Sequence, residues 1–480
     1  MKTASSLSNY LRISLVSLFI ALLGLAPYPH SSASLLQDAS RAIANGDLLI
    51  ASQNLADVSE YFPWRYTLNL AAGKLALQAG APEAAILYLE RPGTISHLSI
   101  DDLILLGDAY LQSGDTLMAE AIWKHVSELE ASNPADERLA NLYIQRKDFI
   151  SAVHVFEVLL SNNPSDINLY YQVGSLYAIT DPIKALPFLA QAEEIDSIHA
   201  DRAHILYDKI RTASLFDNPS YTLLITGRQY ANWGEWELAA EAFHNATVLQ
   251  PDYADAWAFI GEARQQMDQL GMGGKSKAGL HELEYALQMN PDSTLANTFM
   301  GLFWERQEDF YQAQIFLERA IVTSPKDPFL YAELGNVLAK TGDLPAAQSA
   351  YETAIHLTPQ DPLFYRLLAE FALQYQIQIR ELALPAARQA INIDPMNADA
   401  LDVMAQVMLM LQDYHSAERF AQSALQADRG FSPAYLHLGT AYLYLGESNL
   451  ARHWLRLAET VNPDSWIASQ AKRLLDYYFP

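Results

Sequence analysis

Residues 327–359 read DPFLYAELGNVLAKTGDLPAAQSAYETAIHLTP, and this stretch decides the fold of the chain. Its small and large apolar residues recur at spacings of three and four, which is typical of amphipathic helices. Gly335, Ala347 and Tyr351 mark its frame. Residues of the same kinds stand 34 positions earlier: Gly301, Ala313 and Leu317. A period of this length indicates an array of repeats instead of one globular core.

The same frame recurs along most of the chain. In the clearest copies a small residue is followed by an aromatic residue or Leu, then by Ala-type positions and finally by Pro. We count about twelve copies, some of them with a small insertion or deletion. The small residues that mark them are Ala39, Gly73, Gly107, Ala140, Gly174, Gly227, Gly261, Gly301, Gly335, Ala369, Ala405 and Gly439.

Each recurring residue type has a physical role in a pair of helices. Small residues allow two antiparallel helices to approach closely, and larger apolar residues fill the space around them. Between the helices, a Gly followed by an acid predicts a turn, because Gly adopts the left-handed conformation and the acid caps the next helix. Such turns are Gly46-Asp47, Gly114-Asp115, Gly234-Glu235, Gly342-Asp343 and Gly446-Glu447. Pro then ends the second helix, as at Pro251, Pro291, Pro325, Pro359 and Pro463.

This order of small residue, aromatic residue or Leu, Ala, aromatic residue, Ala and Pro resembles the tetratricopeptide repeat family. The resemblance extends from about Ser34 to Pro463, and it implies an all-α fold: a right-handed α-solenoid, or superhelix, of about twelve helix-turn-helix units. Most units lack the Trp that the family carries near the start of each repeat. Trp257 is the clearest exception.

The frame also predicts how the chain is divided. Units one to five occupy residues 34–196, and units six to twelve occupy residues 218–463. Residues 197–217 fall outside the period and predict an extra linking helix, either a rigid insert or a hinge. Sparse Pro and Gly favour the rigid insert. Its apolar residues have roughly helical spacing: Ala203, Leu206, Ile210 and Leu215. Residues 464–480 are expected to form a C-terminal capping helix.

The first 33 residues form a separate segment. Lys2 and Arg12 precede the apolar run ISLVSLFIALLGLA, residues 13–26, and small residues follow at Ser31 and Ala33. This order predicts a signal peptide or an uncleaved N-terminal membrane anchor. We therefore expect the repeats to be exported across the cytoplasmic membrane or anchored in it on the extracytoplasmic side. The alternative is an anchored chain that faces the cytoplasm. Any membrane contact is expected through this segment alone.

Composition restricts the classes of function. The chain has 480 residues and no Cys, which excludes disulfides and thiolate chemistry. Its formal net charge is −25. Nucleic-acid binding requires Lys and Arg to displace phosphate counterions, so we expect no nucleic-acid partner. A field this acidic favours basic or neutral partners.

Residues 269–279, QLGMGGKSKAG, contain the end of a phosphate-binding loop, G-K-S. However, Gln269 stands where such a loop has its first Gly, and the residues before it have helical spacing. We interpret the segment as an enlarged turn in the seventh unit. The chain also lacks H-E-x-x-H and G-x-S-x-G motifs, and its His residues are scattered. We therefore expect no catalytic, cofactor-binding or metal-binding residues and no cofactor.

In the family, the first helix of each unit lines an inner groove. The frame assigns these candidate partner contacts to that groove: Tyr171, Arg228, Asn232, Glu262, Gln265, Gln266, Glu305, Arg306, Asn336, Lys340, Arg366, Glu370, Gln374 and Gln406. An ordinary solvated helix face would also be polar, so both interpretations stay open.

The sequence favours a non-catalytic protein–protein interaction scaffold or adaptor of the cell envelope. A preformed concave groove suits protein or peptide recognition better than enclosure of a small substrate. The first alternative is a structural component of a polysaccharide export or secretion machine. The second is an enzyme whose site carries no known motif, which the geometry of a solenoid disfavours.

Overall fold

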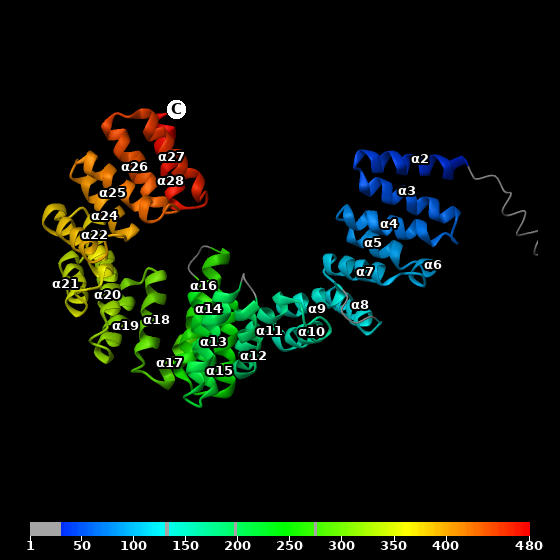
Figure 1. Ribbon diagram of the computed structural model, residues 1–480, viewed down its shortest axis with the longest axis horizontal. Helices are drawn as coiled ribbons and strands as arrows, with labels where there is room; N and C mark the ends of the chain where they lie inside the picture. The colour runs from blue at the N-terminus through cyan, green and yellow to red at the C-terminus, as the bar shows by residue number, and fades with distance from the viewer. Residues whose placement is uncertain (1–29, 130–133, 196–198, 273–275) are drawn as a thin grey trace, which may run out of the picture. The chain divides into compact units, whose positions relative to one another are not determined.

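A computed structural model describes residues 30–129, 134–195, 199–272 and 276–480, and Figure 1 shows its helices along the chain. In these ranges the regular elements are α-helices and one π-helical turn, with no strand. The predicted all-α fold is therefore confirmed. Most of the predicted signal peptide or anchor, residues 1–29, lies outside the described residues. The description begins at His30, the first residue of α2. No helix within the described ranges combines the length and the apolar character needed to cross a membrane.

The chain forms two compact units, residues 1–215 and 216–480. In the described part of the first unit, consecutive helices pack as antiparallel pairs, and each pair packs on the next. The pairs are α2 (His30–Asn45) with α3 (Leu48–Tyr61), α4 (Tyr66–Gln78) with α5 (Pro82–Leu89), α7 (Ile100–Gln112) with α8 (Thr116–Leu129), α9 (Pro134–Gln145) with α10 (Phe149–Asn162), and α11 (Ile167–Thr180) with α12 (Pro182–Ile195). The short α6 (Pro92–Ile95) lies between the second and third pairs, and α13 (Ala200–Ser214) follows the fifth.

The second unit repeats this arrangement in the described part of residues 216–480. The pairs are α14 (Pro219–Asn232) with α15 (Trp236–Leu249), α16 (Ala254–Met272) with α17 (Leu280–Met289), α18 (Thr294–Arg306) with α19 (Phe310–Thr323), α20 (Pro328–Thr341) with α21 (Leu344–Leu357), α22 (Pro362–Gln374) with α23 (Leu384–Ile393), α24 (Ala398–Met410) with α25 (Tyr414–Ala427), and α26 (Ser432–Leu445) with α27 (Ser448–Val461). The last helix, α28 (Trp466–Tyr478), packs on α27 and fully buries Ala471.

Helix α13 occupies most of the stretch 197–217. It packs on α11 and α12, and its side chains Ala203, Leu206 and Ile210 are completely buried. Leu215 does not continue this face. Its side chain is 81% exposed because α13 ends at Ser214.

The small marker residues lie where the two helices of a pair come closest. A Cβ atom at Gly227 would stand 2.5 Å from the ring of Phe243, and one at Gly335 would stand 3.0 Å from the ring of Tyr351. In both pairs the large residue is 16 positions after the Gly and belongs to the second helix. The proposed role of small residues in close helix packing is therefore confirmed at these positions.

The turn between paired helices uses a left-handed residue seven positions after the marker. All five predicted Gly residues have positive φ, for example +89° at Gly342 and +78° at Gly446. The next acid caps the second helix at Asp343, whose side chain accepts from the backbone N–H of Ala346. At Asp47 the side chain makes no such bond. The predicted capping role is therefore confirmed at Asp343 but not at Asp47.

Several units place another residue at this left-handed position. Gln412 has φ +62°, a conformation that costs a non-Gly residue about 1–2 kcal/mol. We expect Gln412→Gly to raise the free energy of unfolding by about 0.5–1 kcal/mol, because Gly removes this strain but gains freedom in the unfolded chain. Thermal melts of the full chain would measure the change. Gly446→Ala is the matched control and should lower stability; a loss of stability in both variants would contradict the argument.

An aromatic side chain near the start of many first helices donates a hydrogen bond to a backbone carbonyl in the turn before the helix. Trp257 donates from Nε1 to the carbonyl of Pro251 at 2.9 Å. The phenol of Tyr331 donates in the same way to Pro325 at 3.1 Å. Equivalent Tyr donors, four positions before their markers, are Tyr170, Tyr365 and Tyr435. Tyr therefore stands at the place of the family's Trp in these units, which explains why Trp is rare at that repeat position.

Two units accommodate additional residues in different ways. In the seventh, α16 continues to Met272 and is longer than its neighbours, so part of the predicted enlarged turn is helical; residues 273–275 lie outside the described ranges. In the tenth, Gln376 and Gln378 both have positive φ, and a π-helical turn, η1 (Ile379–Ala383), leads into α23. A π-helical turn absorbs inserted residues without ending the helix.

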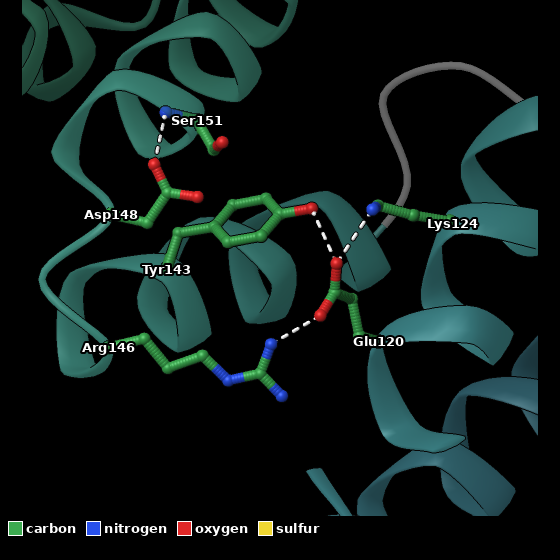
Figure 2. Close-up of polar contacts among 6 residues, drawn as sticks. All are labelled: Glu120, Lys124, Tyr143, Arg146, Asp148 and Ser151. Atoms are coloured by element: carbon green, nitrogen blue, oxygen red, sulfur yellow. Dashed lines mark hydrogen bonds and ion pairs between the residues drawn. The ribbon is translucent and has the colours of Figure 1, made fainter. Parts of the chain in front are cut away.

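A recurring Tyr–Glu hydrogen bond joins consecutive pairs. Figure 2 shows one example, in which Glu120 of α8 accepts from Lys124 at 2.6 Å and from Tyr143 of α9 at 3.1 Å, and pairs with Arg146. The hydrogen bond from Lys124, together with that from Arg146, holds the pKa of Glu120 below its usual range. The same Tyr position donates to the preceding pair in three other units: Tyr110 to Glu90, Tyr177 to Glu157 and Tyr442 to Glu418.

The bond of Tyr177 predicts a loss of stability at alkaline pH. Burial, followed by the hydrogen bond to Glu157, raises the pKa of Tyr177 to about 12, from about 10 in an unfolded chain. The stabilisation by this phenol is therefore complete below pH 10 and is lost as the pH rises towards 12. We expect Tyr177→Phe to lower the free energy of unfolding by about 1 kcal/mol at pH 8. Urea titrations of both proteins at pH 8, 10 and 11 should show that the difference between their free energies of unfolding decreases as the pH rises. A difference that stays constant would refute this account.

Candidate functional site

The first helices of four consecutive pairs line a groove in residues 216–480. Three adjoining hollows, of about 840, 230 and 190 Å³, make up this groove, and Glu370 of α22 lines all three. The other walls come mainly from α20, α24 and α26, with Trp466 and Ile467 of α28 at one of the smaller hollows. We call this feature the α20–α26 groove.

Part of the predicted groove surface lies in these hollows. The lining includes four of the side chains that the repeat frame assigns to the inner face: Asn336, Glu370, Gln374 and Gln406. Gln374 is exposed, and Asn336, Glu370 and Gln406 are half-buried. Their role as partner contacts stays a prediction.

Other lining residues were not identified from the sequence. Tyr414, at the start of α25, and Tyr444, near the end of α26, stack with ring centroids 4.8 Å apart and line the largest hollow. Leu373, Leu409 and Met410 complete an apolar wall beside them. Met410 and Tyr444 stand five positions after their markers, as the predicted residues Lys340 and Gln374 do, so the repeat frame could have assigned both to the inner face.

Glu370 sits at the centre of the groove beside a single cationic side chain. Arg366, one turn earlier on α22, donates to it at 2.5 Å. Burial raises the pKa of Glu370, and the negative charges of Asp399 and Asp402 act in the same direction, while Arg366 opposes them. The raised pKa of Glu370 is therefore due mainly to burial.

Asp402 and His437 form a second polar contact in the groove wall. The Asp402 side chain is only 4% exposed and lies 2.7 Å from Nδ1 of His437, which is 16% exposed. Gln406 donates to the other carboxylate oxygen at 3.2 Å. This contact connects α24 with α26 and fixes the orientation of both side chains.

Arg306 belongs to a hydrogen-bonded network with three other predicted groove residues, of which it contacts two directly. Its guanidinium donates to both carboxylate oxygens of Glu262, at 2.6 and 2.8 Å, and to Oε1 of Gln265 at 2.7 Å. Gln266 also donates to Glu262, at 2.7 Å. The Glu262 side chain is 8% exposed and that of Arg306 is 23% exposed. These residues connect α16 with α18.

Glu305 connects α18 with α20 in a similar way. Asn336 donates to it at 2.8 Å and Lys340 at 2.6 Å. Glu333, one turn before Asn336 and Val337 on α20, faces the same region. Burial raises its pKa, with a further contribution from the charge of Glu305. The charges of Lys340 and Arg306 oppose this rise in the pKa of Glu333.

The remaining predicted residues have separate surroundings. Tyr171 belongs to residues 1–215, where it is buried and its ring stacks on His199 with centroids 4.5 Å apart. Arg228 is exposed and its guanidinium lies 5.7 Å from the ring centroid of Phe259. Asn232 is exposed at the last position of α14. Of the three, Tyr171 offers little surface to a partner.

Nothing in the described ranges forms a group of three or more His, Asp or Glu side chains placed to hold a metal ion. The acids of the groove instead contact amides, a guanidinium and an imidazole. The arrangement can therefore bind polar and cationic groups and shelter a nonpolar side chain against the tyrosines.

Comparisons with known proteins support the tetratricopeptide repeat family. Residues 333–376 and 432–465 each match a tetratricopeptide repeat model. The first segment spans most of α20 through α22, and the second spans α26 and α27. Proteins built from this repeat are generally scaffolds for protein interactions.

Individual relatives are distant. Anaphase-promoting complex subunit 3 of Schizosaccharomyces pombe is 22% identical over 219 residues, which are 42% of this chain and 32% of that protein. The chain thus spans about a third of the length of this curated relative. Among solved structures, the APC/C hetero-tetramer Cut9-Hcn1 is 14% identical, with 96% of this chain and 92% of that chain covered and a TM-score of 0.41. Yeast Tom70 is 13% identical, with 79% and 95% covered and a TM-score of 0.40.

Proposed function

We propose that this chain is a non-catalytic protein-interaction scaffold of the cell envelope whose partners bind in the α20–α26 groove. The observation that carries the proposal is the groove itself, in which one helix face from each of four consecutive pairs contributes polar side chains. Peptide segments are recognised in such surfaces by several modest contacts. Because the stacked helices are already ordered, binding costs little conformational entropy in the scaffold.

The placement in the envelope is supported by the apolar run in residues 13–26 with Lys2 and Arg12 before it. We propose that the repeats lie on the extracytoplasmic side, either exported or held by an uncleaved anchor. Protease treatment of spheroplasts, in which the outer layers of the envelope are opened but the cytoplasmic membrane is intact, and of lysed cells would test this, with N-terminal sequencing of the recovered chain to distinguish cleavage from anchoring. Degradation only after lysis of the spheroplasts would contradict an extracytoplasmic location.

Partner binding is tested by crosslinking and affinity capture of the full chain from source cells, followed by mass spectrometry. The groove variant replaces Gln374, Gln406 and Tyr444 with Ala, since all three line the largest hollow. The predicted groove residues Arg306, Asn336 and Lys340 are unsuitable because their contacts with Glu262 and Glu305 join helices of neighbouring pairs.

The matched control replaces two Gln and one Tyr on second helices: Gln314, Gln348 and Tyr311. We expect the groove variant to lose partners that the control retains. If both variants retain every partner, the groove is not the binding surface. Recovery of polysaccharide without specific protein partners would instead favour a structural component of a polysaccharide export or secretion machine.

A further inference from the structure

The α20–α26 groove has an unbalanced charge. Its lining contains the carboxylates of Glu333, Glu370, Asp399 and Asp402, whereas no Lys or Arg lines any of the three hollows. His437 is the remaining titratable base there. Opposite charges across an interface steer association and select the partner. The imbalance therefore favours a cationic occupant.

The carboxylates differ in how far they are already satisfied. Arg366 pairs with Glu370, and His437 pairs with Asp402. Glu333 and Asp399 make no hydrogen bond or ion pair with any other residue that the structure describes, although the charges of Lys340 and Arg306 act on Glu333. They line different hollows, Glu333 the α20 hollow and Asp399 the α24–α28 hollow, and Glu370 lines both. Two separated acids can thus receive two cationic groups.

The largest hollow, which shares Glu370 with the other two, offers a nonpolar surface. Tyr444 is 59% exposed and Met410 is 44% exposed, although both are large and Tyr444 stacks on Tyr414. Leu373 and Leu409 line the same hollow of about 840 Å³. A hollow of this size accommodates a large nonpolar side chain, and burying one there contributes about 1.5–3 kcal/mol. The tyrosine faces also attract a guanidinium.

We infer that the α20–α26 groove binds an extended segment of a partner protein that carries Lys or Arg side chains together with a nonpolar side chain. The cationic groups contact Glu333, Glu370 and Asp399, and the nonpolar side chain contacts the wall of Tyr444 and Met410. This inference rests on the proposed function and specifies its partner. A second copy of the chain is a poorer occupant, because the chain carries a net charge of −25.

An unbiased peptide library tests the chemistry of the occupant. Random nine-residue peptides displayed on phage would span about 30 Å when extended. They are selected on the full chain at low salt, and the Gln374, Gln406 and Tyr444 groove variant serves for counter-selection. We expect enrichment of peptides that combine Lys or Arg with an aromatic or aliphatic residue. Enrichment of acidic or uncharged peptides would overturn the inference but leave the proposed function standing. If no peptide is enriched, both fail.

Charge-removing variants then locate the contact. Fluorescence anisotropy of the enriched peptide compares Glu333→Gln with Asp399→Asn in one chain against a control with Glu352→Gln and Asp476→Asn. The control changes the same charge at exposed positions on α21 and α28, outside the lining of the three hollows. We expect about tenfold weaker binding in the groove variant only, and a steeper loss with salt in the control than in the groove variant. Equal loss in both would show that net charge, and not the groove, attracts the peptide.

Discussion

Arg306→Met is expected to lower the free energy of unfolding by about 2–4 kcal/mol, since removing one partner strands the buried charge of the other. The Glu262 carboxylate is 8% exposed and loses both of its guanidinium hydrogen bonds in this variant. Gln265 loses its acceptor contact at the same time. Partial exposure of Arg306 keeps the expected effect below that of a fully buried pair. Urea titration of the full chain, followed by circular dichroism, measures the loss.

A double variant separates stranded charge from lost packing. Glu262→Gln in the Arg306→Met background removes the charge while keeping the shape of the side chain. We expect this double variant to recover about half of the lost stability, because a neutral amide is less costly to bury than a carboxylate. If the double variant is as unstable as the single one, desolvation of Glu262 is not the cause and the loss comes from packing alone.

Gly227→Ala is the second change with a large expected effect. The new Cβ would lie 2.5 Å from the ring of Phe243, and that ring is fully buried, so it cannot turn into solvent. Overpacking of this kind costs about 1–3 kcal/mol, against which the better helix propensity of Ala recovers at most about 1 kcal/mol. A lower thermal midpoint in differential scanning calorimetry is the expected result.

The equivalent position in another unit gives a graded comparison. At Gly335 the nearest ring atom of Tyr351 would be 3.0 Å from the Cβ, so a small shift of the ring accommodates the methyl group. We expect Gly335→Ala to be clearly less destabilising than Gly227→Ala. A reversed order would mean that close approach of the helices does not determine which marker positions require Gly.

The repeat frame was predictable because each marker and its partner make a local contact at a fixed spacing. Gly227 and Phe243 illustrate this, and so does the turn at Gly342 with φ +89°. Tyr331 was also within reach of the sequence, because an aromatic residue recurs four positions before several markers. Its hydrogen bond to the carbonyl of Pro325 did not follow from the family pattern, which carries Trp at that place.

The partners of the groove side chains were not predictable in the same way. A periodic frame assigns a residue to a helix face, but it does not say which polar side chains on that face bond to one another. Arg306 contacts Glu262, which lies 44 positions earlier on a helix of another pair. Ion pairing at that distance depends on side-chain conformations and on local burial, neither of which follows from the period.

The Tyr–Glu bonds between pairs also bear on how the chain folds. Tyr143 and Glu120 are 23 positions apart, and Tyr177 and Glu157 are 20 apart. Contacts this local close short loops, and topologies dominated by them fold quickly. Each new helix pair can therefore pack against the preceding pair while later pairs are still being synthesised. A growing chain of this kind need not wait for its C-terminus before it buries its apolar faces, which shortens the time during which those faces are open to aggregation.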